Sequence, residues 1–228
     1  CRTSPILFIF IFLLTLSNSS FSQTIPVILK ERDRASAVDD ILEDRIENLP
    51  PVLMRREGID MWVIISREYN EDPVMKTMLP STWLSARRRT IMVFFDPGAG
   101  KPLDKLAIAR YDVGTLLKGE WDLSSNPDQW DALVKVIKQK NPKKIGLNFS
   151  KNYGHADWLT YNEHEEFLQK LSKDFHQKIV SAENMAVGLF ETRTVKEMAI
   201  YSMICRISHE TIEVAYSEQV IKSGISNI

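Results

Sequence analysis

The sequence has little cysteine, little glycine and no excess of charge of either sign. Its 228 residues include 2 cysteines, 9 glycines and 10 prolines, and 29 basic side chains balance 30 acidic ones. Two cysteines cannot form a disulfide scaffold, and so few glycines and prolines exclude collagen-like or low-complexity material. The near-neutral charge balance argues against a nucleic-acid coat or a polybasic membrane-surface protein. An apolar content of 44% is typical of a globular protein instead.

The chain also lacks an apolar run that is long enough to span a membrane. The longest run covers about a dozen residues, 5–16, with one positive charge before it and small polar residues after it. A membrane-spanning helix needs about 20 residues, whereas this three-part order is typical of a secretory signal peptide with Ser20 and Ser22 at the cleavage site. We therefore expect residues 1–22 to be a signal peptide and the mature protein to be exported, periplasmic or extracellular, without stable membrane insertion. An uncleaved anchor is the alternative.

Helical and strand-like segments alternate along the middle of the chain. Helical spacing of apolar residues is found over 33–57, 126–141 and 160–171, and apolar runs of strand length lie at 61–66, 90–96, 106–111, 144–148 and 177–181. The run at 61–66 is apolar at nearly every position, which indicates a central strand covered on both faces. This alternation predicts an α/β fold with a mixed β-sheet flanked by helices.

Two boundaries of the first helix can be predicted from single residues. Pro50 and Pro51 are expected to interrupt it, because proline has no N–H to donate and its ring clashes with the preceding turn. Gly58 is a suitable C-cap for the segment that follows the prolines.

The pattern changes after residue 182. Thr194 and Glu197 have the spacing of a capping box, and the apolar stripe behind them predicts a long helix that ends near residues 222–224. This stripe includes Cys205, which we expect to be a buried, inert thiol rather than a nucleophile. A helix with such a stripe needs a partner layer that the following residues do not supply. We therefore expect a first domain over residues 23–185 and the incomplete beginning of a second over 186–228.

Motif searches predict no catalytic residue and no metal ligand in this chain. The glycine-rich stretch 98–101 is followed by proline and indicates a hairpin turn rather than a phosphate loop. His164 and Glu165 lack the second histidine of a zinc motif, and His209 with Glu213 is better explained as a solvated pair on a helix. The arginine run 87–89 could bind phosphate or carboxylate, but an exposed, solvated run of charges is the favoured interpretation.

One loop carries more chemistry than its neighbours. Residues 66–73 follow the buried strand directly and contain an arginine, a tyrosine, an amide and three carboxylates. Ligands commonly bind at loops that follow the central strands of α/β sheets. The alternative is a loop held by internal salt bridges and an Asx turn. The candidates for a substrate cleft are Arg67, Glu68, Tyr69, Asn70 and Asp72.

Several short segments share the order and spacing of a known family. They are 44–46 (DRI), 53–54 (LM), 58–64 (GIDMWVI), 67–73 (REYNEDP), 88–89 (RR), 181–184 (SAEN), 187–188 (VG), 191–194 (ETRT), 197–198 (EM) and 207–210 (ISHE). Together they resemble the N-terminal domain of the creatinase/prolidase/aminopeptidase P family. The resemblance is greatest to exported bacterial Xaa-Pro aminopeptidase-like members of this family. The segments between 181 and 210 resemble the part of those proteins that leads into the first helix of the catalytic domain.

The resemblance implies a two-domain metalloenzyme. Its N-terminal domain would have a ribonuclease-H-like shape, help to form a homodimer and close over a peptide substrate. Its C-terminal "pita-bread" domain would hold two divalent metal ions, commonly manganese, through two Asp, one His and two Glu, and these ions would activate water against the bond before proline. None of the four histidines here matches a family catalytic histidine.

This chain is therefore expected to be the non-catalytic N-terminal portion of such an enzyme. Its partners would be its own catalytic domain, a second copy and the peptide substrate, with no nucleic acid, and it should be inactive alone. The alternative is a free-standing, non-enzymatic binding or dimerisation module with the same fold.

Overall fold

The computed structural model describes residues 28–98 and 100–225. Leu29–Ser202 form one unit, and the described residues from Met203 onward belong to another. Residues 1–22, where a signal peptide is expected, lie outside the described part. None of the helices formed by the described residues combines the length and the hydrophobicity that a bilayer span requires.

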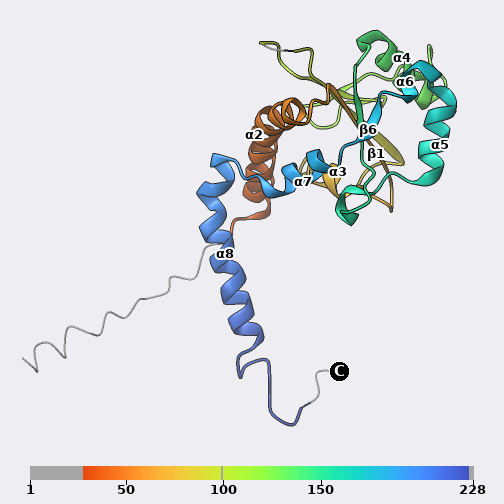
Figure 1. The fold of residues 1–228 in the computed structure, drawn as a ribbon. Coiled ribbons are helices and arrows are strands. Elements are labelled where there is room, and N and C mark those ends of the chain that lie inside the picture. The colour runs from red at the N-terminus through yellow and green to blue at the C-terminus, as the bar shows by residue number, and fades with distance from the viewer. Residues whose placement is uncertain (1–27, 99, 226–228) are drawn as a thin grey trace, which may run out of the picture. The chain divides into compact units, whose positions relative to one another are not determined.

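A mixed β-sheet runs through the unit Leu29–Ser202 (Figure 1). Within the described residues its six strands are β1 (Met61–Arg67), β2 (Arg89–Phe95), β3 (Asp104–Ala107), β4 (Lys118–Gly119), β5 (Ile145–Leu147) and β6 (Ile179–Ser181). They lie side by side in the order β4-β3-β2-β1-β5-β6. β1 pairs antiparallel with β2, from Met61 opposite Phe95 to Arg67 opposite Arg89, and parallel with β5. β3 is antiparallel to β2, and the pairs β3–β4 and β5–β6 are parallel.

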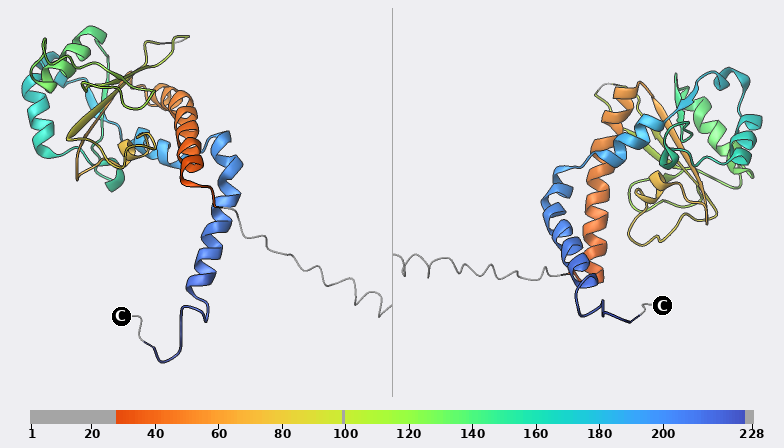
Figure 2. Two further views of the ribbon diagram at one scale, coloured as in Figure 1. Left: turned by 180° about the vertical axis from the view of Figure 1, so that it is seen from behind. Right: turned by 60° about the horizontal axis from the view of Figure 1, so that its bottom comes forward.

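Helices cover both faces of this sheet (Figures 1 and 2). One face packs against α2, α3 and α7, and the other packs against α4 and α5. The helices of the unit are α2 (Glu31–Glu57), α3 (Pro73–Lys76), α4 (Gln129–Lys140), α5 (Tyr161–Lys170), α6 (Lys173–His176) and α7 (Glu183–Glu191), with a short 3₁₀ turn at Gly154–Ala156. The predicted class, a mixed sheet flanked by helices, is confirmed.

Strand β1 shows why the predicted central strand is apolar at nearly every position. Met61, Val63 and Ile65 point to the face that α4 and α5 cover, and Trp62 and Ile64 point to the face that α2 and α7 cover. All five side chains are buried. Because successive side chains of a strand alternate between faces, a strand covered on both sides needs apolar residues throughout.

The predicted break at Pro50 and Pro51 is wrong, since α2 continues through both prolines. Ile46 and Leu49 before them and Leu53 after them belong to one buried cluster. The helix therefore packs along its length, and this packing outweighs the local cost of the prolines. The predicted cap at Gly58 is confirmed by its left-handed φ of 63°.

Two other predicted boundaries shift by a few residues. Helix α4 begins at Gln129 rather than near residue 126, because the side chain of Asp128 accepts a hydrogen bond from Trp130 N at 2.9 Å and caps the helix there. Its end at Asn141 is as predicted, with a left-handed φ of 45°. Strand β3 covers Asp104–Ala107 rather than 106–111, and it pairs antiparallel with β2 across the stretch where a hairpin turn was predicted.

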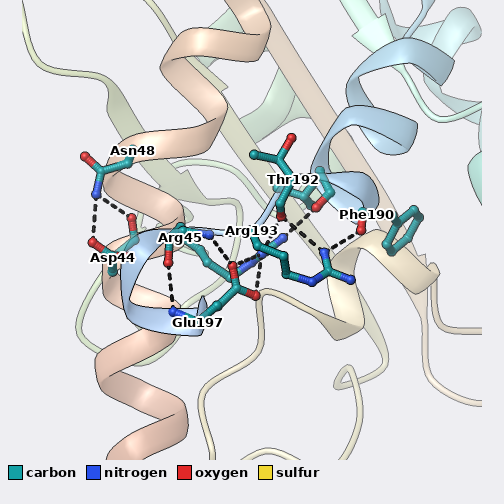
Figure 3. A network of polar contacts seen from close by, with 9 residues as sticks. Asp44, Arg45, Asn48, Phe190, Thr192, Arg193 and Glu197 are labelled. Carbon is teal, nitrogen blue, oxygen red and sulfur yellow. Dashed lines mark hydrogen bonds and ion pairs between the residues drawn. The ribbon is translucent and has the colours of Figure 1, made fainter. Parts of the chain in front are cut away.

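A polar junction joins α2 to the end of α7 and the start of α8 (Val195–Ala215) (Figure 3). The guanidinium of Arg45 donates to both carboxylate oxygens of Glu197, at 2.6 and 2.7 Å, and to the carbonyl oxygens of Leu189 and Thr192. Thr194 and Glu197 form the predicted capping box, with Thr194 N donating to Glu197 Oε2 at 2.8 Å and Glu197 N donating to Thr194 Oγ1 at 3.3 Å.

Two predictions for α8 are wrong. The helix ends at Ala215 rather than near residues 222–224. Just beyond that end, the hydroxyl of Ser217 donates to the carbonyl oxygen of Val214 at 2.7 Å and the chain turns, since serine competes with the helical ladder. Cys205 is exposed rather than buried, because no residue of α8 is buried.

Candidate functional site

The loop after β1 turns back sharply at the end of the strand. Glu68 N donates to the carbonyl oxygen of Arg88 at 2.6 Å, and Asn70 N donates to the carbonyl oxygen of Arg67 at 3.0 Å. Glu68 also accepts a hydrogen bond from Arg88 N at 3.2 Å through its Oε2 atom. These bonds extend the β1–β2 ladder past the strand ends, so the loop is held against the arginine run before β2.

A cavity of about 420 Å³ opens beside this loop. It forms because the antiparallel pairing places the end of β1 next to the start of β2, and the first turns of α5 lie beside them. We call it the arginine–glutamate cavity, and its lining residues are Arg67, Glu68, Tyr69, Arg88, Arg89, Glu163 and Glu166. Its volume is in the range of small-molecule sites.

Arg89 is fully engaged by its protein neighbours. Its Nε atom donates to Gln129 Oε1 at 2.9 Å, and its Nη1 atom donates to Glu166 Oε2 at 3.1 Å. Its guanidinium also lies 4.2 Å from the ring centroid of Trp130, a cation–π contact. Trp130 in turn donates its indole N–H to Glu166 Oε2 at 2.9 Å. Arg89 and Glu166 thus line the cavity as a hydrogen-bonded ion pair, with Trp130 packed behind them.

Glu163, by contrast, is buried with one carboxylate oxygen unsatisfied. Its side chain is only 3% exposed, its Oε2 accepts from the hydroxyl of Thr160 at 3.0 Å, and its Oε1 has no hydrogen-bond partner among the described residues. The nearest cation is Arg67, whose Nε lies 3.9 Å from Oε1, beyond hydrogen-bond distance. Burial raises the pKa of Glu163, opposed by the Thr160 hydroxyl and by Arg67. A buried oxygen without a partner is rare and calls for a reason.

The backbone at the cavity is strained at two positions. Tyr69 and Arg88 have φ values of 68° and 48°, in the left-handed region that bulky side chains seldom adopt. Such conformations cost about 1–3 kcal/mol each and cluster at ligand-binding sites. The Tyr69 side chain is 92% exposed, so it stands at the rim rather than in the cavity.

Asp72 lies behind the loop, in a buried network. It caps α3 by accepting from Val74 N at 2.7 Å, and it accepts from Asn148 Nδ2 at 2.8 Å. Asn148 accepts from the indole N–H of Trp62, and the Asp72 N–H donates to the hydroxyl of Ser66. Burial raises the pKa of Asp72 to about 6, although these hydrogen bonds oppose the rise.

The structure brings three of the five predicted cleft residues together in the arginine–glutamate cavity, namely Arg67, Glu68 and Tyr69. Asn70 closes the turn, and Asp72 is buried as the cap of α3, so neither lines this cavity. Asn70 is bonded within the loop and Asp72 accepts from Val74 N two residues on, as the predicted Asx turn requires, although Asp72 also bonds to Asn148 outside the loop.

Glu163 and Glu166 were not predicted for the cavity. Glu163 forms a capping box with Thr160, because Glu163 N donates to Thr160 Oγ1 at 3.4 Å and Thr160 Oγ1 donates to Glu163 Oε2 at 3.0 Å. Its spacing of four from Phe167 is the signal that could have found it, because it places a carboxylate on the buried face of α5.

No cluster of three or more His, Cys, Asp or Glu suited to a metal ion occurs among residues 28–98 and 100–225. The two metal ions that the family resemblance implies, with their five protein ligands, therefore do not fit the described residues.

Comparison with solved structures finds similarity to an Xaa-Pro dipeptidase from Bacillus anthracis. The TM-score is 0.48 and the sequence identity is 13%, over 86% of this chain and 45% of that one, so this chain spans less than half the length of that protein. No family model matches this chain, and no curated protein matches it.

Proposed function

We propose that this chain is the non-catalytic N-terminal portion of a metal-dependent hydrolase of the Xaa-Pro aminopeptidase/prolidase type, where it serves dimerisation and closure of the substrate cleft. The proposal depends on the ordered series of short segments between residues 44 and 210 that resembles this family. Two of these segments, 58–64 and 67–73, contain the central strand β1 and the loop that reaches the arginine–glutamate cavity.

In this proposal the chemistry belongs to a second domain. Two metal ions there would supply an activated water for attack on the bond before proline. The present chain would contribute Arg67, Glu68 and Tyr69 to the approach of the peptide, as charged and aromatic groups at one end of its sheet.

Kinetics of the complete two-domain protein test this role. We expect Tyr69→Ala and Arg67→Gln to raise KM for an Xaa-Pro peptide with little change in Tm, because both side chains are exposed and act on substrate binding. Tyr161→Ala is the matched control, since Tyr161 is also exposed (76%) but does not line the cavity. An unchanged KM in both variants would show that these residues do not contribute to substrate binding.

The 228-residue chain alone should not hydrolyse Xaa-Pro peptides in the presence of Mn²⁺, because its described residues hold no set of metal ligands. Turnover by this chain would refute the placement of the chemistry in another domain.

Dimerisation and export belong to the same proposal. Sedimentation equilibrium of the complete protein should give twice the protomer mass, and a monomer at micromolar concentration would contradict the dimer. Mass spectrometry of the exported protein should give an N-terminus at Gln23, whereas an intact residue 1–22 segment would favour the membrane anchor.

A free-standing binding module is the second candidate, and one observation favours it. The arginine–glutamate cavity is formed entirely by residues of the unit Leu29–Ser202. The reading frame beyond Ile228 separates the two candidates. A stop codon there favours the module, and a continuing frame with two Asp, one His and two Glu at family spacing favours the enzyme.

A further inference from the structure

Among the described residues, three charged side chains that line the arginine–glutamate cavity have hydrogen-bonding atoms without a partner. Glu163 Oε1 is buried and unsatisfied. Among the described residues, the guanidinium of Arg67 has only this oxygen at 3.9 Å, and the guanidinium of Arg88 has no ion pair or hydrogen bond. Arg89 and Glu166, on the same cavity, satisfy each other. The cavity therefore presents two cations without a hydrogen-bonded partner, and one unpaired carboxylate oxygen that lies buried beside Arg67.

The lining as a whole is neutral. Three arginines are matched by three glutamates, so the cavity offers no net attraction to a multiply charged anion such as phosphate. A ligand with one positive and one negative group matches the neutral charge of the lining. It also matches the arrangement of the charged groups, because Arg67 and Glu163 lie side by side. A volume of about 420 Å³ suits a small molecule.

We propose that the arginine–glutamate cavity binds a small zwitterion, an α-amino acid, whose carboxylate pairs with Arg67 and Arg88 and whose ammonium group pairs with Glu163. This site needs neither a metal centre nor a second domain, so it goes beyond the function proposed above.

The contacts of Arg67 and Glu163 explain why both ends of the ligand would be held. Arg67 is 54% exposed and lies too far from Glu163 for a hydrogen bond, so it can turn toward a carboxylate, which guanidinium groups bind through two parallel N–H donors. Such a movement would take the guanidinium away from Oε1 of Glu163. An ammonium group beside it would then supply the hydrogen bond that the buried oxygen lacks and compensate its desolvation.

The surroundings are suited to holding such a ligand in one orientation. Arg89 and Glu166 are held by hydrogen bonds to each other, to Gln129 and to Trp130. Arg88 is held by the hydrogen bonds of its backbone to Glu68, in a strained left-handed conformation. Strain of this kind persists where the surrounding structure preorganises a site.

Titrations of the 228-residue chain test the proposal with four probes. Glycine carries both charged groups, acetate carries only the carboxylate, methylammonium carries only the cation, and inorganic phosphate represents an anion site. We expect saturable binding of glycine by calorimetry or NMR, at least tenfold tighter than acetate or methylammonium. Absent glycine binding, glycine binding no tighter than acetate, or tighter binding of phosphate would each overturn the proposal.

Two variants assign the binding to this cavity. Glu163→Gln keeps the shape of the side chain and its contact with Thr160 but removes the charge, and Arg67→Gln removes the half-exposed cation. Each should weaken glycine binding at least tenfold, whereas Glu165→Gln and Arg110→Gln, which alter charges outside the cavity, should leave it unchanged. Wild-type affinity in both cavity variants would overturn the site.

Circular dichroism separates a binding defect from a folding defect. Should Glu163→Gln fail to fold, Arg67→Gln decides the matter, because a half-exposed arginine without a hydrogen-bonded partner can be replaced with little effect on stability. A folded Arg67→Gln that binds glycine like the wild type would exclude the proposed site.

Discussion

At the scale of single residues, the most consequential group outside the cavity is Asp72. Its carboxylate holds three elements together, because it caps α3, accepts from Asn148 next to β5 and through Asn148 reaches Trp62 of β1. Asp72 is only 1% exposed. This burial penalises its charged form, and the pKa therefore rises from 3.8 to about 6.

The raised pKa of Asp72 predicts that the contribution of this residue to folding stability falls as the pH rises from about 4 to about 6. In this window the folded protein keeps a proton on Asp72 that the unfolded chain has already released. The contribution is fully present below the unfolded pKa and lost above the folded one. The loss is about 3 kcal/mol, at 1.36 kcal/mol for each pKa unit.

Urea denaturation of the wild type and Asp72→Ser at pH 4 and pH 7 measures this effect. Serine is also a good N-cap but does not titrate. The stability of the wild type relative to the variant should therefore be lower at pH 7 than at pH 4. A difference that stays constant or grows with pH would show that Asp72 ionises in the fold as easily as in the unfolded chain.

How far such residues are predictable depends on what surrounds them. The pair Asp72–Pro73 indicates a helix start from the sequence alone, because proline is favoured in the first turn after a cap. The burial of Asp72 cannot be predicted in this way, because it depends on contact with Asn148, which is 76 residues away along the chain. The unpaired oxygen of Glu163 likewise follows from the meeting of α5 with β1, which spacing within either element does not reveal.

At the scale of elements, α2 shows packing prevailing over local preference. Proline inside a helix is about 3 kcal/mol less favourable than alanine, yet α2 continues through Pro50 and Pro51 because its apolar side chains are buried on both sides of them. We expect Pro51→Ala to stabilise the protein by about 1 kcal/mol, since alanine restores the N–H that faces the carbonyl oxygen of Glu47.

Urea denaturation of Pro51→Ala at constant pH measures this gain. Pro51 is only partly buried, so little packing is lost with its ring. A destabilised variant would mean that the helix needs the bend that proline imposes.

The junction of α2, α7 and α8 depends on one arginine. Arg45 is 11% exposed and its partner Glu197 is 17% exposed, and Arg45 also satisfies two carbonyl oxygens at the end of α7. Arg45→Ala should cost about 3 kcal/mol, because it leaves a largely buried carboxylate and these carbonyl groups without their donor. Arg45→Lys should recover only part of this loss, since an ammonium group lacks the planar fork.

Chemical denaturation with Arg56→Ala as the control measures the contribution of Arg45. Arg56 lies on the same helix and pairs with Glu57, but its side chain is 52% exposed, so its loss should cost less than about 1 kcal/mol. Equal effects of the two substitutions would show that Arg45 is an ordinary surface arginine.

At the scale of the whole molecule, the sheet divides the core into two clusters. Their buried members lie between Leu42 and Leu189, on opposite faces of the sheet. The main helices and the strands between residues 61 and 181 could be predicted, because burial on one or both faces leaves a periodic apolar pattern. Strand β4 could not, since it has two residues and both are exposed.

This distribution of the core predicts that Leu29–Ser202 folds without the residues that follow. All buried members of the two clusters lie inside this unit. The described residues from Met203 onward include no buried residue, so their removal deletes little apolar burial. A protein of residues 29–202 should unfold cooperatively, with a Tm within about 3 °C of that of the full chain.

Thermal unfolding of two truncations provides the comparison. A protein of residues 29–182 also lacks α7, whose side chains Met185, Ala186 and Leu189 are buried in the cluster with α2. Exposing that face of α2 should lower the Tm of this shorter protein by more than 10 °C or abolish its cooperative transition, because several fully buried apolar side chains are lost at once. If 29–202 instead loses its transition while retaining α7, the stability of the unit must depend on residues outside this range, and Leu29–Ser202 would not be an independent folding unit.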